Sequence, residues 1–234
     1  MKIKRPVVDY RELRLSNLNT DRFRHLNLLF YWLLFGLMFF LLERVVPVDS
    51  YYPMYCRWDN YIPFNELFVF PYMFWFVFLI GIHVYTLLYD IEAFRKLMKY
   101  IILTYSAALI VFILFPNCQQ LRPAEFERDN ILTQFMAAFY KFDTNTNVCP
   151  SLHVIGSVAV LTSAVNIKRF QTPAWMTFFI ISTILISIST VFLKQHSVID
   201  IIVALPICFL AYFPCYVAVP RKRNAKKEGL YESN

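Results

Sequence analysis

Residues 64–89 read FNELFVFPYMFWFVFLIGIHVYTLLY, and apolar side chains dominate this stretch. A run of about 20 apolar residues is long enough to cross the hydrocarbon core of a bilayer as a helix. The run has to be helical, because lipid offers no partner to unpaired backbone N–H and C=O groups. Five further apolar stretches occur at about residues 26–46, 97–115, 151–167, 173–193 and 197–219. The sequence therefore predicts an all-α, polytopic membrane protein with six transmembrane helices.

The composition agrees with a membrane location. Hydrophobic residues make up 58% of the chain and charged residues 17%, whereas an ordinary soluble domain is roughly 45–50% apolar. The net charge is +7, and the basic residues cluster beside the apolar runs, which favours membrane over nucleic acid. The first run ends at Glu43-Arg44 without a small-residue cleavage site, so we interpret it as a retained span and not as a secretory signal.

Basic residues are divided unequally between the two sides of the membrane that six alternating spans define. Of the 23 Lys and Arg, 17 fall on one side: Lys2, Lys4, Arg5, Arg11, Arg14, Arg22, Arg24, Arg95, Lys96, Lys99, Lys168, Arg169, Arg221, Lys222, Arg223, Lys226 and Lys227. The other side holds Arg44, Arg57, Arg122, Arg128, Lys141 and Lys194. By the positive-inside rule, both termini are expected in the cytoplasm. This predicts a cytoplasmic N-terminal segment (1–25), a membrane domain (26–219) and a basic cytoplasmic tail (220–234).

Five cysteines occur, none of them in a CxxC pair: Cys56, Cys118, Cys149, Cys208 and Cys215. The last two lie in an apolar run and are expected to be packing residues. The first three fall in loops on one side, where Cys118 and Cys149 are candidates for a disulfide. The odd count leaves at least one free thiol.

The polar residues of greatest interest fall at the external ends of the last four predicted spans. His196 and Asp200 are four residues apart, which places them on one face of a helix. A carboxylate there can fix the imidazole tautomer and leave the other ring nitrogen as a nucleophile or base. The alternative is an interfacial salt bridge or cap without chemistry, because this spacing is common.

A second group opens the fourth predicted span. Pro150-Ser151 is typical of a helix start, and the free N–H groups of a helix N-terminus suit a phosphate. His153 would lie in the first turn. Arg122 is a candidate phosphate clamp and Lys194 a second cation. The plainer alternatives are an ordinary cap, an interfacial histidine and basic anchoring at the membrane surface.

Together these residues resemble the type 2 phosphatidic acid phosphatase superfamily of membrane enzymes. The family pattern has an Arg-Pro after one helix, Pro-Ser-Gly-His opening the next, and a final Ser-Arg, five residues, His, three residues, Asp. The matching segments here, in order and spacing, are Arg122-Pro123, Pro150-Ser151-Leu152-His153 and Ser189 to Asp200. The resemblance covers about residues 56–205. It implies a six-helix fold with the active site at the external ends of helices 3–6.

Three positions depart from the family pattern. Phe115 stands where the family has Lys, Thr190 where it has Arg, and Leu152 where it has Gly. The Leu152 and Thr190 departures make these motifs resemble the branch that contains inositol phosphorylceramide synthase, and so does the segment 59–64 with Pro71-Tyr72. That branch transfers a phosphoryl headgroup between lipids instead of hydrolysing a phosphate.

The resemblance implies a role for each residue. His196 would attack phosphorus to form a phosphohistidine, Asp200 would orient it, and His153 would transfer protons. The phosphate-binding positions would be Arg122, Ser151, Leu152 and Lys194. No metal or cofactor is required on this scheme. The expected substrate is a phospholipid or a polyprenyl or sphingolipid phosphate ester, held among membrane lipids, with the site facing outside or the lumen.

Two other classes of function stay open at this point. One is a metal-dependent hydrolase with His153, His196 and Asp200 as ligands. The other is a non-enzymatic membrane protein or transporter with a degenerate site. A transporter should carry polar residues at mid-membrane, yet the spans here are almost wholly apolar there. The sequence leaves the oligomeric state open.

Overall fold

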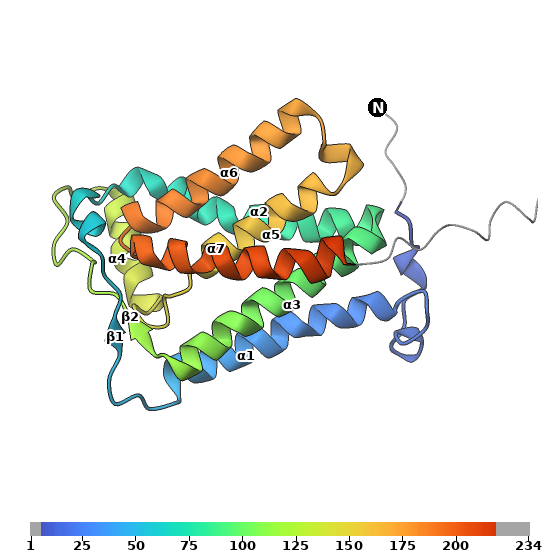
Figure 1. Cartoon of the computed structure of the whole chain (residues 1–234), viewed down its shortest axis with the longest axis horizontal. Helices are drawn as coiled ribbons and strands as arrows, with labels where there is room; N and C mark the ends of the chain where they lie inside the picture. The colour runs from blue at the N-terminus through green and yellow to red at the C-terminus, as the bar shows by residue number, and fades with distance from the viewer. Residues whose placement is uncertain (1–5, 219–234) are drawn as a thin grey trace, which may run out of the picture.

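A computed structural model describes residues 6–218, and within them the chain is a helical bundle (Figure 1). The α-helices are α1 (Phe30–Arg44), α2 (Val69–Tyr89), α3 (Ile91–Leu114), α4 (Ile131–Phe142), α5 (Leu152–Val165), α6 (Pro173–Phe192) and α7 (Val198–Tyr212). Two short strands, β1 (Tyr52–Pro53) and β2 (Asn117–Cys118), pair in parallel. Short 3₁₀ turns are η1 (Tyr10–Glu12), η2 (Leu15–Asn17), η3 (Arg24–Leu29), η4 (Arg57–Tyr61), η5 (Glu66–Phe68) and η6 (Lys168–Phe170), and a π-turn, η7, covers Phe213–Val217. The predicted all-α class is confirmed.

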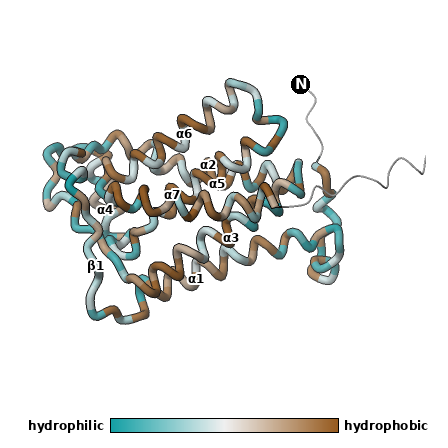
Figure 2. The backbone as a smooth tube through the Cα atoms, in the orientation of Figure 1, coloured by the Kyte–Doolittle hydropathy of each residue, from teal (hydrophilic) through white to brown (hydrophobic). Residues whose placement is uncertain are grey.

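The hydropathy of the chain has the pattern of a membrane protein (Figure 2): hydrophobic residues fill the middle of the helices, and hydrophilic ones gather at the two ends of the bundle. Five helical segments are long and apolar enough to cross a bilayer: Arg24–Arg44, Glu66–Tyr89, Ile91–Leu114, Pro173–Phe192 and Val198–Val217. They coincide with five of the six predicted spans. The chain is therefore an integral membrane protein.

The sixth predicted span, residues 151–167, forms the shorter helix α5. Its 14 residues give a length of about 21 Å at 1.5 Å per residue, less than the roughly 30 Å of a hydrocarbon core. The described part of the chain thus holds five helices of spanning length, and the count of six spans is not confirmed. A short helix is tolerated here because α5 contacts α2, α3, α6 and α7, so protein surrounds it.

Helix α3 begins earlier than the predicted span, at Ile91. Asp90 caps it, because its side chain accepts a hydrogen bond of 3.0 Å from Ala93 N. The charges of this turn suggested a loop, but Glu92 and Lys96 form an i,i+4 ion pair on the helix surface. The predicted tail (220–234), Lys2, Lys4, Arg5 and the cations of the tail lie outside the described residues.

The segment 116–150, which the sequence predicts to be external, is more ordered than a long loop. It contains α4, whose N-cap Asn130 exchanges hydrogen bonds with Thr133 in a capping box. The candidate Cys118–Cys149 disulfide is absent, since both thiols are free and buried. Asn117 joins the same two stretches instead: its Nδ2 donates to Cys149 O (2.9 Å), and its Oδ1 accepts from Cys149 N (2.8 Å). These bonds tie β2 to the start of α5.

Candidate active site

His196 lies in the turn between α6 and α7, and Asp200 lies in the first turn of α7. The imidazole Nδ1 is 3.1 Å from Asp200 Oδ2, and both residues are buried, at 8% and 0% exposure. Asp200 Oδ2 also accepts from Ser197 N at 3.0 Å, which closes a capping box at the helix start. Because the carboxylate accepts at Nδ1, the proton belongs there and Nε2 keeps its lone pair. The sequence-predicted pair is thus an inward-facing imidazole–carboxylate unit.

His153, in the first turn of α5, lies near His196. Its ring centroid is 5.8 Å from that of His196, at an interplanar angle of 67°. Two rings of α2 hold it: Tyr72 stacks on it at 4.3 Å, and Trp75 lies 4.5 Å away. His153 Nε2 is buried without a hydrogen-bond partner. A buried ring nitrogen without a partner, on a histidine near a second histidine, is suited to exchange a proton with a bound ligand.

Gly156 makes the aromatic contact of His153 sterically feasible. A Cβ at this position would lie 2.8 Å from both Trp75 Nε1 and Tyr105 Oη. Only a residue without a side chain lets Trp75 approach α5 this closely. The sequence did not assign Gly156, Tyr72 or Trp75 to the site, because their contacts join separate helices.

Ser151 is the N-cap of α5, and its hydroxyl accepts from Val154 N at 3.5 Å. Its own N–H donates to the carbonyl of Asp200 at 3.2 Å, so the starts of α5 and α7 are joined. Leu152 is the first residue of the helix. The first backbone N–H groups of an α-helix lack partners within it, and His153 is in this first turn. This geometry fits an anion such as phosphate.

Arg122 lies between the end of α4 and the turn that carries His196. Its guanidinium donates to the carbonyls of Tyr140 (3.0 Å), Asp143 (2.9 Å) and Thr144 (2.8 Å), and to Gln195 Oε1 (2.5 Å). An arginine at these carbonyls stabilises the C-terminal end of α4. Its Nε is buried and unpartnered. Arg122 is thus a structural clamp with one donor left for a ligand.

Lys194 does not contact the histidines in this structure. Its ammonium donates to the carbonyls of Asp59, at 3.1 Å, and Ile62 in the α1–α2 loop, and its backbone has a φ of 51°. Burial lowers the pKa of Lys194, and the charge on Asp59 opposes this shift. Lys194 therefore links the turn after α6 to the α1–α2 loop.

Asp59 is a residue of this region that sequence reasoning did not assign to the site. It is 3% exposed and accepts from Ser197 Oγ (2.5 Å), Val198 N (2.9 Å) and Cys56 N (2.8 Å). It therefore caps the N-terminus of α7 from the α1–α2 loop. The segment 59–64 gave a signal through its resemblance to one branch, but the partners of Asp59 lie almost 140 residues away in sequence.

The two positions that lack the family's cations have local packing roles. Phe115 caps α3, and its ring lies 4.9 Å from that of Tyr52. Thr190 is buried, and its carbonyl accepts from the backbone N–H groups of Gln195 and His196. Thr190 thus fixes the backbone of the nucleophile candidate. Within residues 6–218, no three His, Cys, Asp or Glu side chains are grouped as metal ligands, and this includes His153, His196 and Asp200.

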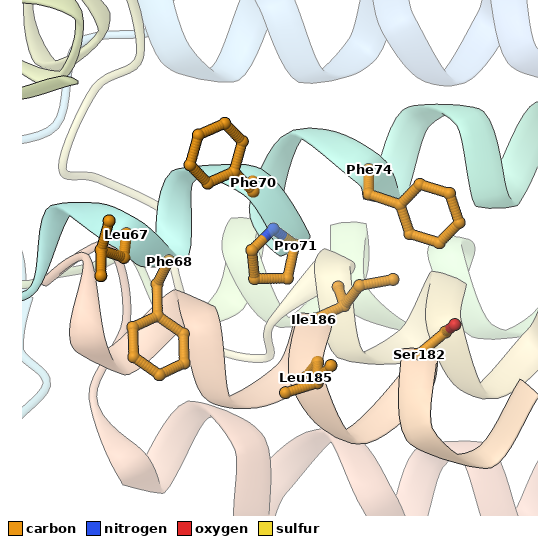
Figure 3. A pocket seen from close by; sticks show the side chains of 8 residues that line it. All are labelled: Leu67, Phe68, Phe70, Pro71, Phe74, Ser182, Leu185 and Ile186. Atoms are coloured by element: carbon orange, nitrogen blue, oxygen red, sulfur yellow. The ribbon is translucent and has the colours of Figure 1, made fainter. Parts of the chain in front are cut away.

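An apolar groove of about 540 Å³ runs between α2 and α6 at the end of the bundle that holds the site (Figure 3). It is lined by Leu67, Phe68, Phe70, Pro71, Phe74, Ser182, Leu185 and Ile186. Phe68 stacks on Phe192 at 4.3 Å, close to the turn of His196. A second groove of about 410 Å³ shares Phe74 and continues between the same helices to Arg169.

A comparison with protein families matches residues 96–224 to the PAP2 superfamily. The chain belongs to the PAP2 superfamily. Members of this superfamily are generally phosphatases or phosphotransferases that act on lipid phosphates. The PAP2 match includes Arg122, Ser151, His153, His196 and Asp200. No curated protein and no solved structure matches the chain.

Proposed function

We propose that this PAP2 superfamily member cleaves a phosphate ester of a membrane lipid through a covalent phosphohistidine on His196. The observation that carries the proposal is the buried contact between His196 Nδ1 and Asp200, with the ring of His153 5.8 Å from that of His196. A fixed tautomer leaves Nε2 of His196 as the nucleophilic atom.

The reaction has two steps. First, His196 Nε2 attacks phosphorus, the bond from phosphorus to the leaving oxygen breaks, and a protonated His153 donates its proton to that oxygen. Asp200 stabilises the positive charge that develops on His196. In the second step His153, now neutral, removes a proton from water or from an acceptor hydroxyl. That oxygen attacks phosphorus, the N–P bond breaks, and both histidines return to their starting states.

The phosphate oxygens have donors at two places. The N-terminus of α5, with Ser151 and Leu152, offers backbone N–H groups, and Arg122 Nε is unpartnered. Donors fixed before the reaction stabilise developing negative charge most effectively. We assign Lys194 an indirect role, because its contacts are with loop carbonyls.

The charge of the site favours headgroup transfer as the second candidate function. Phe115 and Thr190 carry no charge, and the Lys194 ammonium is occupied by carbonyls. A phosphomonoester carries up to two negative charges and a phosphodiester one, so a site with fewer free cations discriminates less against the diester. Transfer of a phosphoryl headgroup from a phosphodiester lipid to an acceptor hydroxyl fits a site with few free cations.

The groove supports a lipid substrate. It is apolar and lies between two helices of spanning length. The end lined by Phe68 is close to the His196 turn. A hydrocarbon chain there would stay in the bilayer while its phosphate reaches the helix N-terminus of α5.

The test is to trap the intermediate. Purified full-length protein is incubated with radiolabelled phosphomonoester and phosphodiester lipids, and protein-bound label that is labile to acid and stable to base is scored. We expect label in the wild type and none in His196→Ala. His153→Ala should keep label from an aryl ester, because it can form the intermediate without a proton donor but cannot activate the second nucleophile.

Two outcomes would overturn the proposal: no trapped label in a wild type that turns over substrate, or unchanged label in His196→Ala. Product analysis in the same reactions separates the candidates. Released phosphate indicates hydrolysis, and labelled acceptor lipid indicates headgroup transfer.

A further inference from the structure

A second pocket lies at the end of the bundle opposite the candidate active site, where the N-terminal segment lies (Figure 1). Its volume is about 460 Å³, and it is formed by η3 and α3. The lining residues are Arg24, His25, Leu28, Arg95, Lys99 and Ile102. Nothing in the proposed reaction uses this pocket.

The pocket has an excess of positive charge. Arg24 is paired with Asp21 at 2.9 Å, but no carboxylate of residues 6–218 forms an ion pair with Arg95 or Lys99. Lys99 Nζ donates to the carbonyl of Pro214 at 2.7 Å, and an ammonium has two further protons to donate. An anionic ligand would balance this charge.

Charge and hydropathy are layered along the pocket. Arg95, Lys99 and Ile102 are spaced at i, i+4 and i+7 and so share one face of α3. On the η3 side, Leu28 follows Arg24 by four residues. The cations therefore lie toward the end of the bundle, and the aliphatic side chains lie toward its apolar middle. An anionic lipid has the same order of headgroup and hydrocarbon.

The wall of the pocket is held by buried contacts. His25 is 2% exposed and bonds through Nε2 to Tyr10 Oη at 2.9 Å. Tyr10 Oη in turn donates to the carbonyl of Leu87 at 2.8 Å, and the His25 ring meets the edge of Phe94. The N-terminal segment thus fixes η3 against α2 and α3, and the cations line an open pocket between η3 and α3.

We propose that this pocket binds an anionic phospholipid, with the phosphate between Arg24, Arg95 and Lys99 and the first part of the acyl chains against Leu28 and Ile102. The aliphatic side of the pocket favours a lipid over free inorganic phosphate. By the positive-inside expectation, this lipid would belong to the cytoplasmic leaflet, whereas the substrate would be handled at the other face.

The experiment maps the lipid directly. Full-length protein is placed in nanodiscs of phosphatidylcholine that contain a minor fraction of phosphatidylglycerol with a photoactivatable group near the glycerol. After illumination, adducts are located by mass spectrometry. We expect adducts on the peptides that contain Leu28 and Ile102, and separate adducts in the α2–α6 groove serve as an internal reference. Since the readout is a covalent adduct, an inactive protein would test the pocket equally well.

Variants that remove basic residues test whether the pocket selects an anionic lipid. Each basic residue near an anionic surface contributes about fivefold in affinity, so Arg95→Gln with Lys99→Gln should lower pocket labelling by about 25-fold at low probe concentration. The matched control is Lys96→Gln, compared with the single variants Arg95→Gln and Lys99→Gln, because each removes one charge from α3. Lys96 pairs with Glu92 outside the pocket. Lys96→Gln should change labelling by less than about twofold.

Three results would overturn the proposal. Equal labelling by a phosphatidylcholine probe would show that the pocket does not select charge. An equal loss in Lys96→Gln would show only general surface attraction. Displacement of the probe by inorganic phosphate as effectively as by unlabelled phosphatidylglycerol would make free phosphate the ligand. Circular dichroism and size-exclusion profiles confirm that the variants are folded.

Discussion

At the scale of single residues, His196 and His153 differ in what holds them. A buried carboxylate binds Nδ1 of His196, while two aromatic rings of α2 hold His153 and leave its Nε2 unpartnered. The first arrangement suits a nucleophile, because the carboxylate stabilises the cation formed on attack. The second suits proton transfer, because the ring is positioned without engaging its nitrogen.

A leaving group that needs no proton separates these roles. General acid–base catalysis contributes about 10²–10⁴-fold, so His153→Ala should lose about that much on a natural lipid and recover much of it on an activated aryl phosphate ester. His196→Ala should recover nothing, and Asp200→Asn should fall between the two. The measurement is the single-turnover rate at which the three variants release the leaving group from both substrates, because the second step still needs His153 as a base. Recovery in His196→Ala alone would reverse the assignment.

The close packing at Gly156 gives a prediction about how the position of His153 affects turnover. Gly156→Ala places a methyl group 2.8 Å from Trp75 Nε1, so Trp75 must move away from His153. Overpacking of this kind costs about 1–3 kcal/mol, and we expect a lower melting temperature and a lower kcat. Gly81→Ala on α2 is the matched control, since nothing lies within 4 Å of a Cβ there. If Gly156→Ala keeps full turnover, the two aromatic rings do not position His153.

The sequence identified residues whose partners are near in sequence. His196 and Asp200 follow from helical spacing, and Ser151 follows from cap chemistry. Lys194 was expected at the phosphate and instead binds loop carbonyls, while Asp59 was not expected to cap α7 at all. Both contacts join segments about 130 residues apart or more, and no local pattern specifies such contacts.

At the scale of elements, the start of α7 depends on a loop that precedes α2. Asp59→Ala would remove the acceptor of Ser197 Oγ and Val198 N, and buried donors without partners cost about 1–3 kcal/mol each. We expect lower thermal stability and a fall in kcat larger than the change in KM, because the turn of His196 loosens. Asp49→Ala in the same loop is exposed and serves as the control. A fall in stability with unchanged kcat would limit Asp59 to a structural role.

The end of α4 gives a prediction about pH. Burial raises the pKa of Asp143, and the charge on Arg122 offsets this only in part. The ionised carboxylate therefore disfavours the folded state, and this cost appears as the pH rises through the raised pKa. Asp143→Asn should raise the melting temperature at neutral pH, and the gain should shrink as the pH falls toward 3.8, the ordinary value.

Melting curves of both proteins across this pH range provide the measurement. The exposed Asp129→Asn is the control, and it should change the melting temperature little at any pH. A constant difference between wild type and Asp143→Asn at all pH values would contradict the shift of the Asp143 pKa.

Hydropathy predicted five of the helices well, because spans of this length give a strong signal. It did not predict that α5 would be short, since burial among four helices removes the need to match the bilayer. It also did not predict α4, which reads as part of a polar loop. Its 12 residues are too few to span a bilayer, and its ends are defined by Asn130 at the start and Arg122 at the end.

At the scale of the whole molecule, the segment that matches the family and the segment before it contribute different residues to the candidate site. Residues 96–224 match the PAP2 superfamily and contain the histidines, the carboxylate and the arginine. The preceding segment, outside the match, supplies Asp59, Tyr72 and Trp75, which cap α7 and hold His153. The motifs alone therefore define the expected chemistry, while the positioning groups depend on α2 and the loop before it.

The orientation in the membrane is a prediction for the whole chain. The basic asymmetry places both termini in the cytoplasm and residues 116–150 outside. An impermeant maleimide should label Glu127→Cys in intact cells, and it should label Arg11→Cys only after permeabilisation. Both positions are exposed, and a Cys56→Ser background removes the half-buried native thiol. The opposite labelling pattern would invert the topology and the sidedness of the site.

The groove between α2 and α6 opens along the side of the bundle, where Leu67 and Phe70 are more than half exposed. A substrate that enters there diffuses in two dimensions and never leaves the bilayer. The quantity that governs encounter is then the mole fraction of substrate among the surrounding lipids. Adding inert lipid or detergent slows the reaction at constant total substrate, and an apparent KM has meaning only as a surface concentration.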